Sequence, residues 1–265
     1  MLKAPRVEIR EYELHRMFLE FFHKAEAERR WNIQRDIPWH RVNHHVNDDL
    51  CKIVESFMAV EMYIPDYVSH LVNLCRRSPG RYLFQISWGY EEIKHGLGLR
   101  EWMLRSGRRT NEELLDFEIE LVRNEWKPDV ETPLGMAIYA MFQEKATALN
   151  YRNLRSAAAQ ENDEALTTLL TLIARDETAH YDFFRRVVDV MAREDRTAAL
   201  REVMHVLKGF RMPAHDLIAD WPERGELIVK LGLFNDRMFL EHIVRPILKS
   251  LGTSMAELRR LSKST

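Results

Sequence analysis

Two short stretches of the chain, Glu91-Glu92-Ile93-Lys94-His95 and Asp176-Glu177-Thr178-Ala179-His180, decide how the sequence is interpreted. Both read acidic-Glu-x-x-His. Residues three apart lie on one face of an α-helix, so the Glu and the His of each stretch can reach the same metal ion. Two such pairs are the larger part of the ligand set that di-metal carboxylate proteins hold inside a four-helix bundle.

The rest of the sequence predicts long helices around these two stretches. Only 10 Gly and 9 Pro occur in 265 residues, and the β-branched residues fall at helical spacing. Ser78-Pro79 and Thr132-Pro133 each read as a helix cap followed by a first-turn proline. Thr110 and Glu113 form a capping box, and Pro65 predicts a kink. Helices are expected at about 7–30, 46–77, 79–106, 110–124, 133–160, 163–193, 197–208 and 225–250.

The four longest of these helices form the predicted bundle. Short loops join the first to the second and the third to the fourth, so each pair is an antiparallel hairpin, and the segment 107–132 crosses between the hairpins. We therefore predict an all-α, ferritin-like four-helix bundle with a crossover connection. No linker divides the chain, so residues 1–265 are expected to form one di-iron domain, with its core at about 46–193 and flanking helices at 7–30 and 197–260.

The other two bundle helices each carry one glutamate at the height of the two motifs. The predicted helix midpoints lie near residues 61, 92, 146 and 178, so Glu61 and Glu144 are placed to complete the site. Glu92 follows Glu61 by 31 residues and Glu177 follows Glu144 by 33, which indicates two related halves about a pseudo-twofold axis. The predicted metal ligands are Glu61, Glu92, His95, Glu144, Glu177 and His180.

Two further Glu-x-x-His pairs, Glu20/His23 and Glu202/His205, test how specific this pattern is. One such pair alone is ordinarily a solvated part of a helix surface. These two lie near the ends of shorter predicted helices and have no glutamates at the same height on neighbouring helices. They are therefore predicted not to bind metal.

Four carboxylates and two imidazoles make a hard, oxygen-rich ligand set. Such a set suits iron or manganese better than zinc or copper(I). The acidic residues before the two ligand glutamates, Glu91 and Asp176, can accept hydrogen bonds from the far ring nitrogens of the histidines on the partner helices. The predicted cofactor is a pair of iron ions, with manganese as an alternative, and chemistry with O₂ would belong to these metals.

The motifs resemble those of the soluble acyl-[acyl-carrier-protein] desaturases, the family of the plant stearoyl-ACP desaturases. The EENRHG and DEKRHE motifs of that family are similar to residues 91–96 and 176–181, and its FQERAT motif to residues 142–147. Its L-P-T-Y and WQPQDFLP segments are similar to residues 61–67 and 31–38. The matches cover about residues 29–185 in the same order.

The resemblance implies a reaction and its partners. An acyl chain held as a thioester on acyl carrier protein would lie in an apolar tunnel past the two iron ions. O₂, with two electrons from a ferredoxin-type donor, would insert a cis double bond. The family also implies a homodimer, and a role in carrier docking for Arg29 and Arg30, which fall where the family carries a lysine.

The resemblance also implies roles for residues around the six ligands. Thr147, three residues after Glu144, would lie beside the O₂ site and help deliver protons. Trp31, His95 and Asp176 would form the electron route from the surface to the metals.

Two other classes of function stay open from the sequence. A di-iron oxygenase that hydroxylates or N-oxygenates another substrate would use the same ligands. A ferroxidase or ferritin relative would need neither an organic tunnel nor an electron partner, and the Trp31 segment disfavours it. Tyr181 replaces an acidic residue of the family, and little family signal extends beyond about Arg193, so acyl length and double-bond position stay open.

Composition indicates where the protein works. The formal net charge is −2, so overall charge does not indicate a nucleic-acid partner. No apolar run approaches the roughly 20 residues of a membrane span, and charged residues soon after Met1 argue against a signal peptide. Cys51 and Cys75 fit no Cys-x-x-Cys pattern and are expected to be free thiols in a reducing compartment. We therefore expect a cytoplasmic protein.

Overall fold

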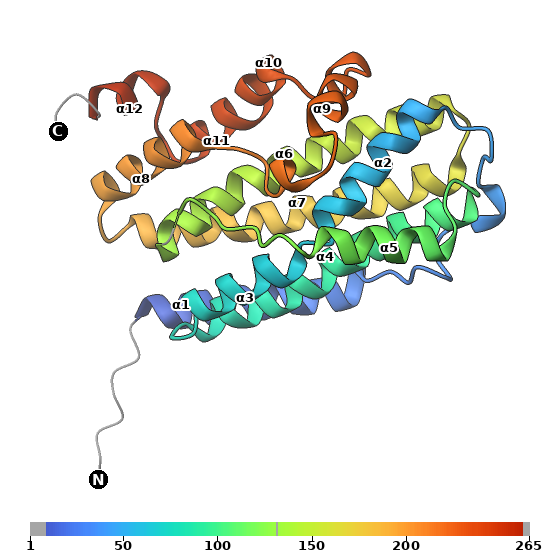
Figure 1. The fold of residues 1–265 in the computed structure, drawn as a ribbon. Helices are drawn as coiled ribbons and strands as arrows, with labels where there is room; N and C mark the ends of the chain where they lie inside the picture. The colour runs from blue at the N-terminus through green and yellow to red at the C-terminus, as the bar shows by residue number, and fades with distance from the viewer. Residues whose placement is uncertain (1–8, 131, 262–265) are drawn as a thin grey trace, which may run out of the picture.

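Two antiparallel helical hairpins build the centre of the molecule (Figure 1). In the computed structural model, which describes residues 9–130 and 132–261, α6 pairs with α7, and α2 followed by α3 runs along α4. The predicted all-α bundle with a crossover is confirmed, and the described residues contain no strand. The elements are α1 (Ile9–Lys24), η1 (Ala25–Arg29), η2 (Trp39–Arg41), α2 (Asp48–Glu61), α3 (Ile64–Leu74), α4 (Pro79–Arg105), α5 (Asn111–Leu121), α6 (Pro133–Gln160), α7 (Glu164–Ala192), α8 (Arg196–Gly209), η3 (His215–Leu217), α9 (Trp221–Lys230), α10 (Asp236–Met238), η4 (Phe239–Val244), α11 (Arg245–Ser250) and α12 (Met255–Leu261).

Side-chain caps begin several of these helices where the sequence predicts them. The Thr132 side chain accepts from the backbone N–H of Gly135 at the start of α6. Thr110 and Glu113 form the complete capping box of α5. Each cap satisfies backbone N–H groups that have no partner inside the helix, which explains why these boundaries could be predicted closely.

The first bundle helix is divided, which corrects the prediction of one kinked helix over 46–77. Helix α2 ends at Glu61 and α3 begins at Ile64, with Pro65 in its first turn. Proline has no N–H to donate, and its ring collides with the carbonyl four residues earlier, which here belongs to Glu61. Glu61 therefore lies at a helix end, yet still at the level of the two motifs.

The C-terminal segment is also more broken than the single helix predicted at 225–250. Helix α9 ends at Lys230, and Gly232 just beyond it adopts a left-handed conformation with φ of +67°. The Leu233 N–H then bonds the Ile228 carbonyl at 2.9 Å, so the chain turns rather than continues. Helix α8 and the π-helical turn η4 pack on α6, and α12 packs on α8.

Helix α1 packs outside the bundle against α4 and α7. The predicted helix at 7–30 corresponds to α1 and the π-helical turn η1, and its predicted start at Val7 lies outside the described residues. No helix in the described part of the chain is both long and apolar enough to cross a membrane. Cys51 and Cys75 are both buried free thiols.

The apolar core is divided along the bundle by a polar layer. One cluster of buried side chains includes Phe84 and Phe183, and a second includes Leu99 and Ile173. Between them, α4, α6 and α7 bury charged residues in place of apolar ones. A buried charge is costly unless a partner or a metal compensates it, so this layer marks the candidate site.

Candidate metal centre

All six predicted ligands converge in the polar layer, and each is at most 4% exposed. Glu92 and Glu177 belong to both of the two overlapping groups whose ligand atoms lie within 4.8 Å of one another. Two neighbouring cations can therefore share these two carboxylates. The groups are Glu61, Glu92, His95 and Glu177, and Glu92, Glu144, Glu177 and His180.

The inward-facing atoms of this cluster lack ordinary partners. Nδ1 of His95 lies 3.2 Å from Glu177 Oε1, and Nδ1 of His180 lies 3.0 Å from Glu92 Oε1. Five atoms of the cluster have no hydrogen-bond partner among the described residues: Nδ1 of His95, Nδ1 of His180, both carboxylate oxygens of Glu177, and Oε1 of Glu92. Leaving one buried polar group unpaired costs about 1–3 kcal/mol. Several unpaired polar atoms in one place are explained if the cluster holds cations. The donor set fits iron or manganese.

Burial and mutual repulsion raise the pKa values of two carboxylates in the cluster. Burial, together with the charges of Glu144 and Glu61, raises the pKa of Glu92 well above its usual value. Burial and the charges of Glu92 and Glu144 do the same for the pKa of Glu177. Without metal, the cluster therefore retains protons that bound cations would displace.

These raised pKa values predict how the metal-free protein responds to pH. Folding favours the protonated form of Glu92 and Glu177, so their contribution to stability is complete below the unfolded pKa, about 4.3, and is lost as pH rises. We expect the Tm of metal-free protein to fall between about pH 5 and about pH 8. Calorimetry with and without bound metal would test this, because cations should abolish the fall. A metal-free Tm that stayed level or rose over that range would contradict the prediction.

The far nitrogens of both histidines contact carboxylates on the opposite motif helix, as predicted. Nε2 of His180 lies 2.6 Å from Glu91 Oε2, and Nε2 of His95 lies 3.4 Å from Asp176 Oδ2. A proton on each Nε2 directs Nδ1 toward the cluster. Burial alone would raise the pKa of Glu91, but the hydrogen bond and charge of His180, with the charge of Arg29, lower it to about 2. Burial also acts to raise the pKa of Asp176, but the hydrogen bond and charge of His95 lower it overall. Each pair of a histidine and its carboxylate, here called a histidine relay, thus ends on an ionised group.

Comparison with known proteins identifies the family. A model of the family described as "Fatty acid desaturase" matches residues 39–263. The chain belongs to this family. It is 26% identical over 170 residues to DesA1 of Mycobacterium tuberculosis, which is named among the acyl-[acyl-carrier-protein] desaturases, covering 61% of this chain and 49% of DesA1.

Two further comparisons define the extent of the likeness. The chloroplastic stearoyl-[acyl-carrier-protein] 9-desaturase 1 of Oryza sativa subsp. indica is 31% identical over 134 residues, 49% of this chain and 34% of that protein. The chain thus spans half or less of these curated relatives. The X-ray structure of DesA2 from Mycobacterium tuberculosis H37Rv has the same fold, with a TM-score of 0.67, 17% identity, and coverage of 96% of this chain and 99% of DesA2.

In this fatty acid desaturase family member, the three residues of the predicted electron route contact one another. The indole Nε1 of Trp31 donates to Asp176 Oδ2 at 2.7 Å, and the indole lies parallel to the His95 ring with centroids 6.5 Å apart. Trp31 is buried in the core rather than exposed in its loop. The contacts are present, and the electron-transfer role stays a prediction.

Thr147 lies on α6 three residues after Glu144, but it belongs to neither ligand group. Its hydroxyl donates to the Gln143 carbonyl at 3.0 Å, a local bond along its own helix. Its role beside an O₂ site therefore stays a prediction.

The two other Glu-x-x-His pairs lie outside the cluster, as predicted. Glu20 is exposed and accepts from Arg186 at 2.8 Å. Glu202 accepts from the Thr132 hydroxyl at 3.0 Å, and both His23 and His205 are exposed. These pairs form parts of helix surfaces.

Two residues of the site were not predicted. The Tyr151 hydroxyl, on the α6 face that carries Glu144 two turns earlier, donates to Glu61 Oε1. Helical periodicity could have indicated this contact. Arg29 is buried beneath the bundle surface, so its predicted docking role is wrong, and it donates instead to Glu91 and Asp176. Two buried carboxylates outside the metal set were the signal that a buried cation had to be present.

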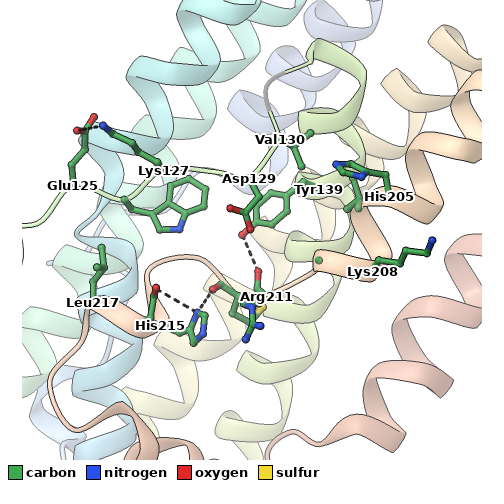
Figure 2. Close-up of a pocket in the computed structure, with 15 residues that line it drawn as sticks. Glu125, Lys127, Asp129, Val130, Tyr139, His205, Lys208, Arg211, His215 and Leu217 are labelled. Atoms are coloured by element: carbon green, nitrogen blue, oxygen red, sulfur yellow. Dashed lines mark hydrogen bonds and ion pairs between the residues drawn. The ribbon is translucent and has the colours of Figure 1, made fainter.

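A surface pocket of about 460 Å³ opens beside the first half of α6 (Figure 2). Its wall includes Trp126 and Tyr139, and the Tyr139 hydroxyl donates to the Arg211 carbonyl at 3.0 Å. Charged side chains of both signs also line it, and the Lys127 ammonium lies 3.1 Å from Glu125 Oε2. The pocket therefore combines aromatic walls with acidic and basic side chains.

Proposed function

We propose that this chain is a di-iron desaturase acting on acyl chains carried as thioesters on acyl carrier protein. The observation that carries the proposal is the pair of overlapping ligand groups that share Glu92 and Glu177. Membership of the fatty acid desaturase family and the names of its relatives support the substrate class.

In this proposal, the chain's residues hold and orient the metals. Glu61 and His95 would hold one iron, Glu144 and His180 the other, with Glu92 and Glu177 between them. Two iron ions there would supply the reduction of O₂ and the removal of hydrogen from an unactivated C–H bond, which side chains cannot supply. The two apolar clusters on either side of the layer exclude water from the site.

The aromatic pocket is the entrance that we propose for the acyl carrier. The Tyr67 ring packs edge-on against Trp126 with centroids 5.0 Å apart, on the inner side of the pocket. Burial, and the charges of Tyr139, Glu61 and Glu92, raise the pKa of Tyr67. Tyr67 thus contacts a wall residue of the pocket, and its hydroxyl donates to the Val60 carbonyl at 3.0 Å, directly before Glu61.

For the electrons, we propose a ferredoxin-type donor that docks near Trp31. Trp31 contacts Asp176 and stacks beside His95, so it is in direct contact with one predicted ligand. The Lys94 ammonium, also buried, lies 4.4 Å from the centre of the Trp31 ring.

The test is product analysis with defined substrates. Iron-loaded, reduced protein would be given O₂ and a panel of acyl carrier thioesters, and the products analysed by mass spectrometry. We expect loss of two hydrogen atoms. Gain of one oxygen atom would show that the protein hydroxylates its substrate and does not desaturate it. Turnover of free fatty acids alone would contradict the proposal that the substrate is bound to a carrier.

Exposed apolar side chains support a homodimer as part of this proposal. Helix α5 and the residue after it expose Leu115, Ile119 and Val122 at helical spacing, each at least 50% exposed. The 2.6 Å contact of Arg100 with Glu118 holds α5 to α4. Neighbouring α4 exposes a second stripe that includes Ile86, Tyr90 and Leu97. Apolar patches of this kind mark interaction surfaces.

Replacing Ile119 by aspartate is expected to convert the dimer into monomers, because two buried carboxylates would face an apolar interface. Sedimentation velocity would measure the change. Val229 on α9 is 58% exposed and lies away from these stripes, so Val229→Asp is the matched control and should leave the dimer intact. A monomeric wild-type chain, or equal effects of both variants, would contradict the interface.

A further inference from the structure

One guanidinium connects the two histidine relays. Arg29 Nη1 donates to Glu91 Oε2 at 2.8 Å and to Asp176 Oδ1 at 2.7 Å, and its Nη2 donates to Glu91 Oε1 at 3.0 Å. Glu91 contacts His180 and Asp176 contacts His95, as described above. The two carboxylates come from different helices, α4 and α7, so Arg29 bridges the two halves of the centre from outside both.

Several contacts around the end of α1 fix the position of the Arg29 side chain. Helix α1 widens into the π-helical turn η1, whose last residue is Arg29. Arg175 of α7 donates to the Arg29 carbonyl at 2.5 Å, and the guanidinium carbon lies 4.9 Å from the centre of the Phe21 ring. A hydrogen bond to its carbonyl, its ion pairs and an aromatic contact thus jointly hold Arg29 in place. π-Helical turns are rare in proteins overall, and those that occur often lie at functional sites.

Neighbouring cations do not make the same connection. Arg30 also donates to Glu91, but it is more exposed and shares its charge with Glu26. Its other hydrogen bond goes to Ser87 and not to Asp176. The Lys94 ammonium lies over Trp31 rather than on the carboxylates. Lys94 and Ala179 directly precede the two histidines, so neither motif supplies a guanidinium there. Arg29 is therefore the guanidinium that joins both relays.

We propose that Arg29 is a positioning residue that fixes the two histidine ligands relative to each other by clamping Glu91 and Asp176 together. This inference rests on the metal-binding part of the proposed function. A guanidinium presents several N–H groups in one rigid plane, so it can satisfy two carboxylates in a fixed geometry. The ammonium of a lysine carries the same charge but lacks that fork.

The test compares Arg29→Lys with Arg186→Lys in the full chain, using cobalt(II) as the probe metal. We expect Arg29→Lys to weaken cobalt binding by about 10–100-fold, the usual effect of losing a partner of a metal-bound histidine, and to alter the visible cobalt spectrum. Arg186→Lys should bind cobalt as wild type does, since Arg186 pairs with exposed Glu20 rather than with Glu91 or Asp176. Wild-type affinity and spectrum in Arg29→Lys would overturn the clamp.

Chemical rescue separates positioning from folding. A cavity of about 630 Å³ between α1 and α7 is lined by Arg29 and reaches the surface, so a small guanidinium ion can enter when the side chain is removed. Cobalt binding by Arg29→Ala should recover several-fold with guanidinium chloride at tens of millimolar and not with sodium chloride. A variant that stays unfolded, or equal recovery in both salts, would overturn the clamp. Absence of cobalt binding by wild type would instead refute the metal centre itself.

Discussion

Replacing Glu177 by alanine is expected to remove both metal ions, because its carboxylate belongs to both ligand groups. Each metal position would lose a charged ligand, and the loss of affinity should exceed the roughly 10–100-fold that follows loss of an outer hydrogen-bond partner. Metal content per chain after anaerobic reconstitution with iron measures the effect. We expect about two ions in wild type and almost none in the variant.

The matched control is Glu202→Ala. Glu202 begins a Glu-x-x-His pair of the same spacing, but it lies on α8 and accepts from Thr132 rather than facing the cluster. The same chemical change there should leave the metal content unchanged. Equal metal in Glu177→Ala and wild type, or equal loss in both variants, would refute the site.

The convergence of the six ligands could be predicted because it depends on helical periodicity. A spacing of three places Glu and His on one face, and positions near the predicted helix midpoints place residues of four helices at one height. The break at Pro65 changes the first helix without moving Glu61 from that height. The ligand positions therefore tolerate an error in the helix boundaries.

Arg29 could not be found in the same way. It comes from a helix outside the bundle and meets residues 62 and 147 positions later in the chain. A pattern within one helix contains no information on such a pairing, and a basic residue at a helix end ordinarily indicates solvent exposure. The left-handed turn at Gly232 was missed for a related reason, since glycine also occurs inside helices.

The second large effect is expected from Gly80→Ala, which tests how α1 is held against the bundle. A Cβ at Gly80, in the first turn of α4, would lie 2.4 Å from the backbone carbon and oxygen of Leu14. Backbone atoms cannot rotate away, so α1 must shift. Overpacking of this kind costs about 1–3 kcal/mol or more, which corresponds to a fall in Tm of about 2–12 °C for a chain of this size.

Because α1 continues into the turn that carries Arg29, the same shift should also weaken metal binding, which links packing at one end of α1 to geometry at the other. Gly225→Ala is the matched control, since a Cβ there meets nothing within 4 Å and Gly225 lies inside α9. An alanine in a helix interior is favoured over glycine by about 1 kcal/mol, so this variant should be slightly more stable and bind metal normally. If Gly80→Ala kept the wild-type Tm, α1 would not be packed against α4 as described. If it lost stability but kept full metal affinity, the clamp would be independent of how α1 is seated.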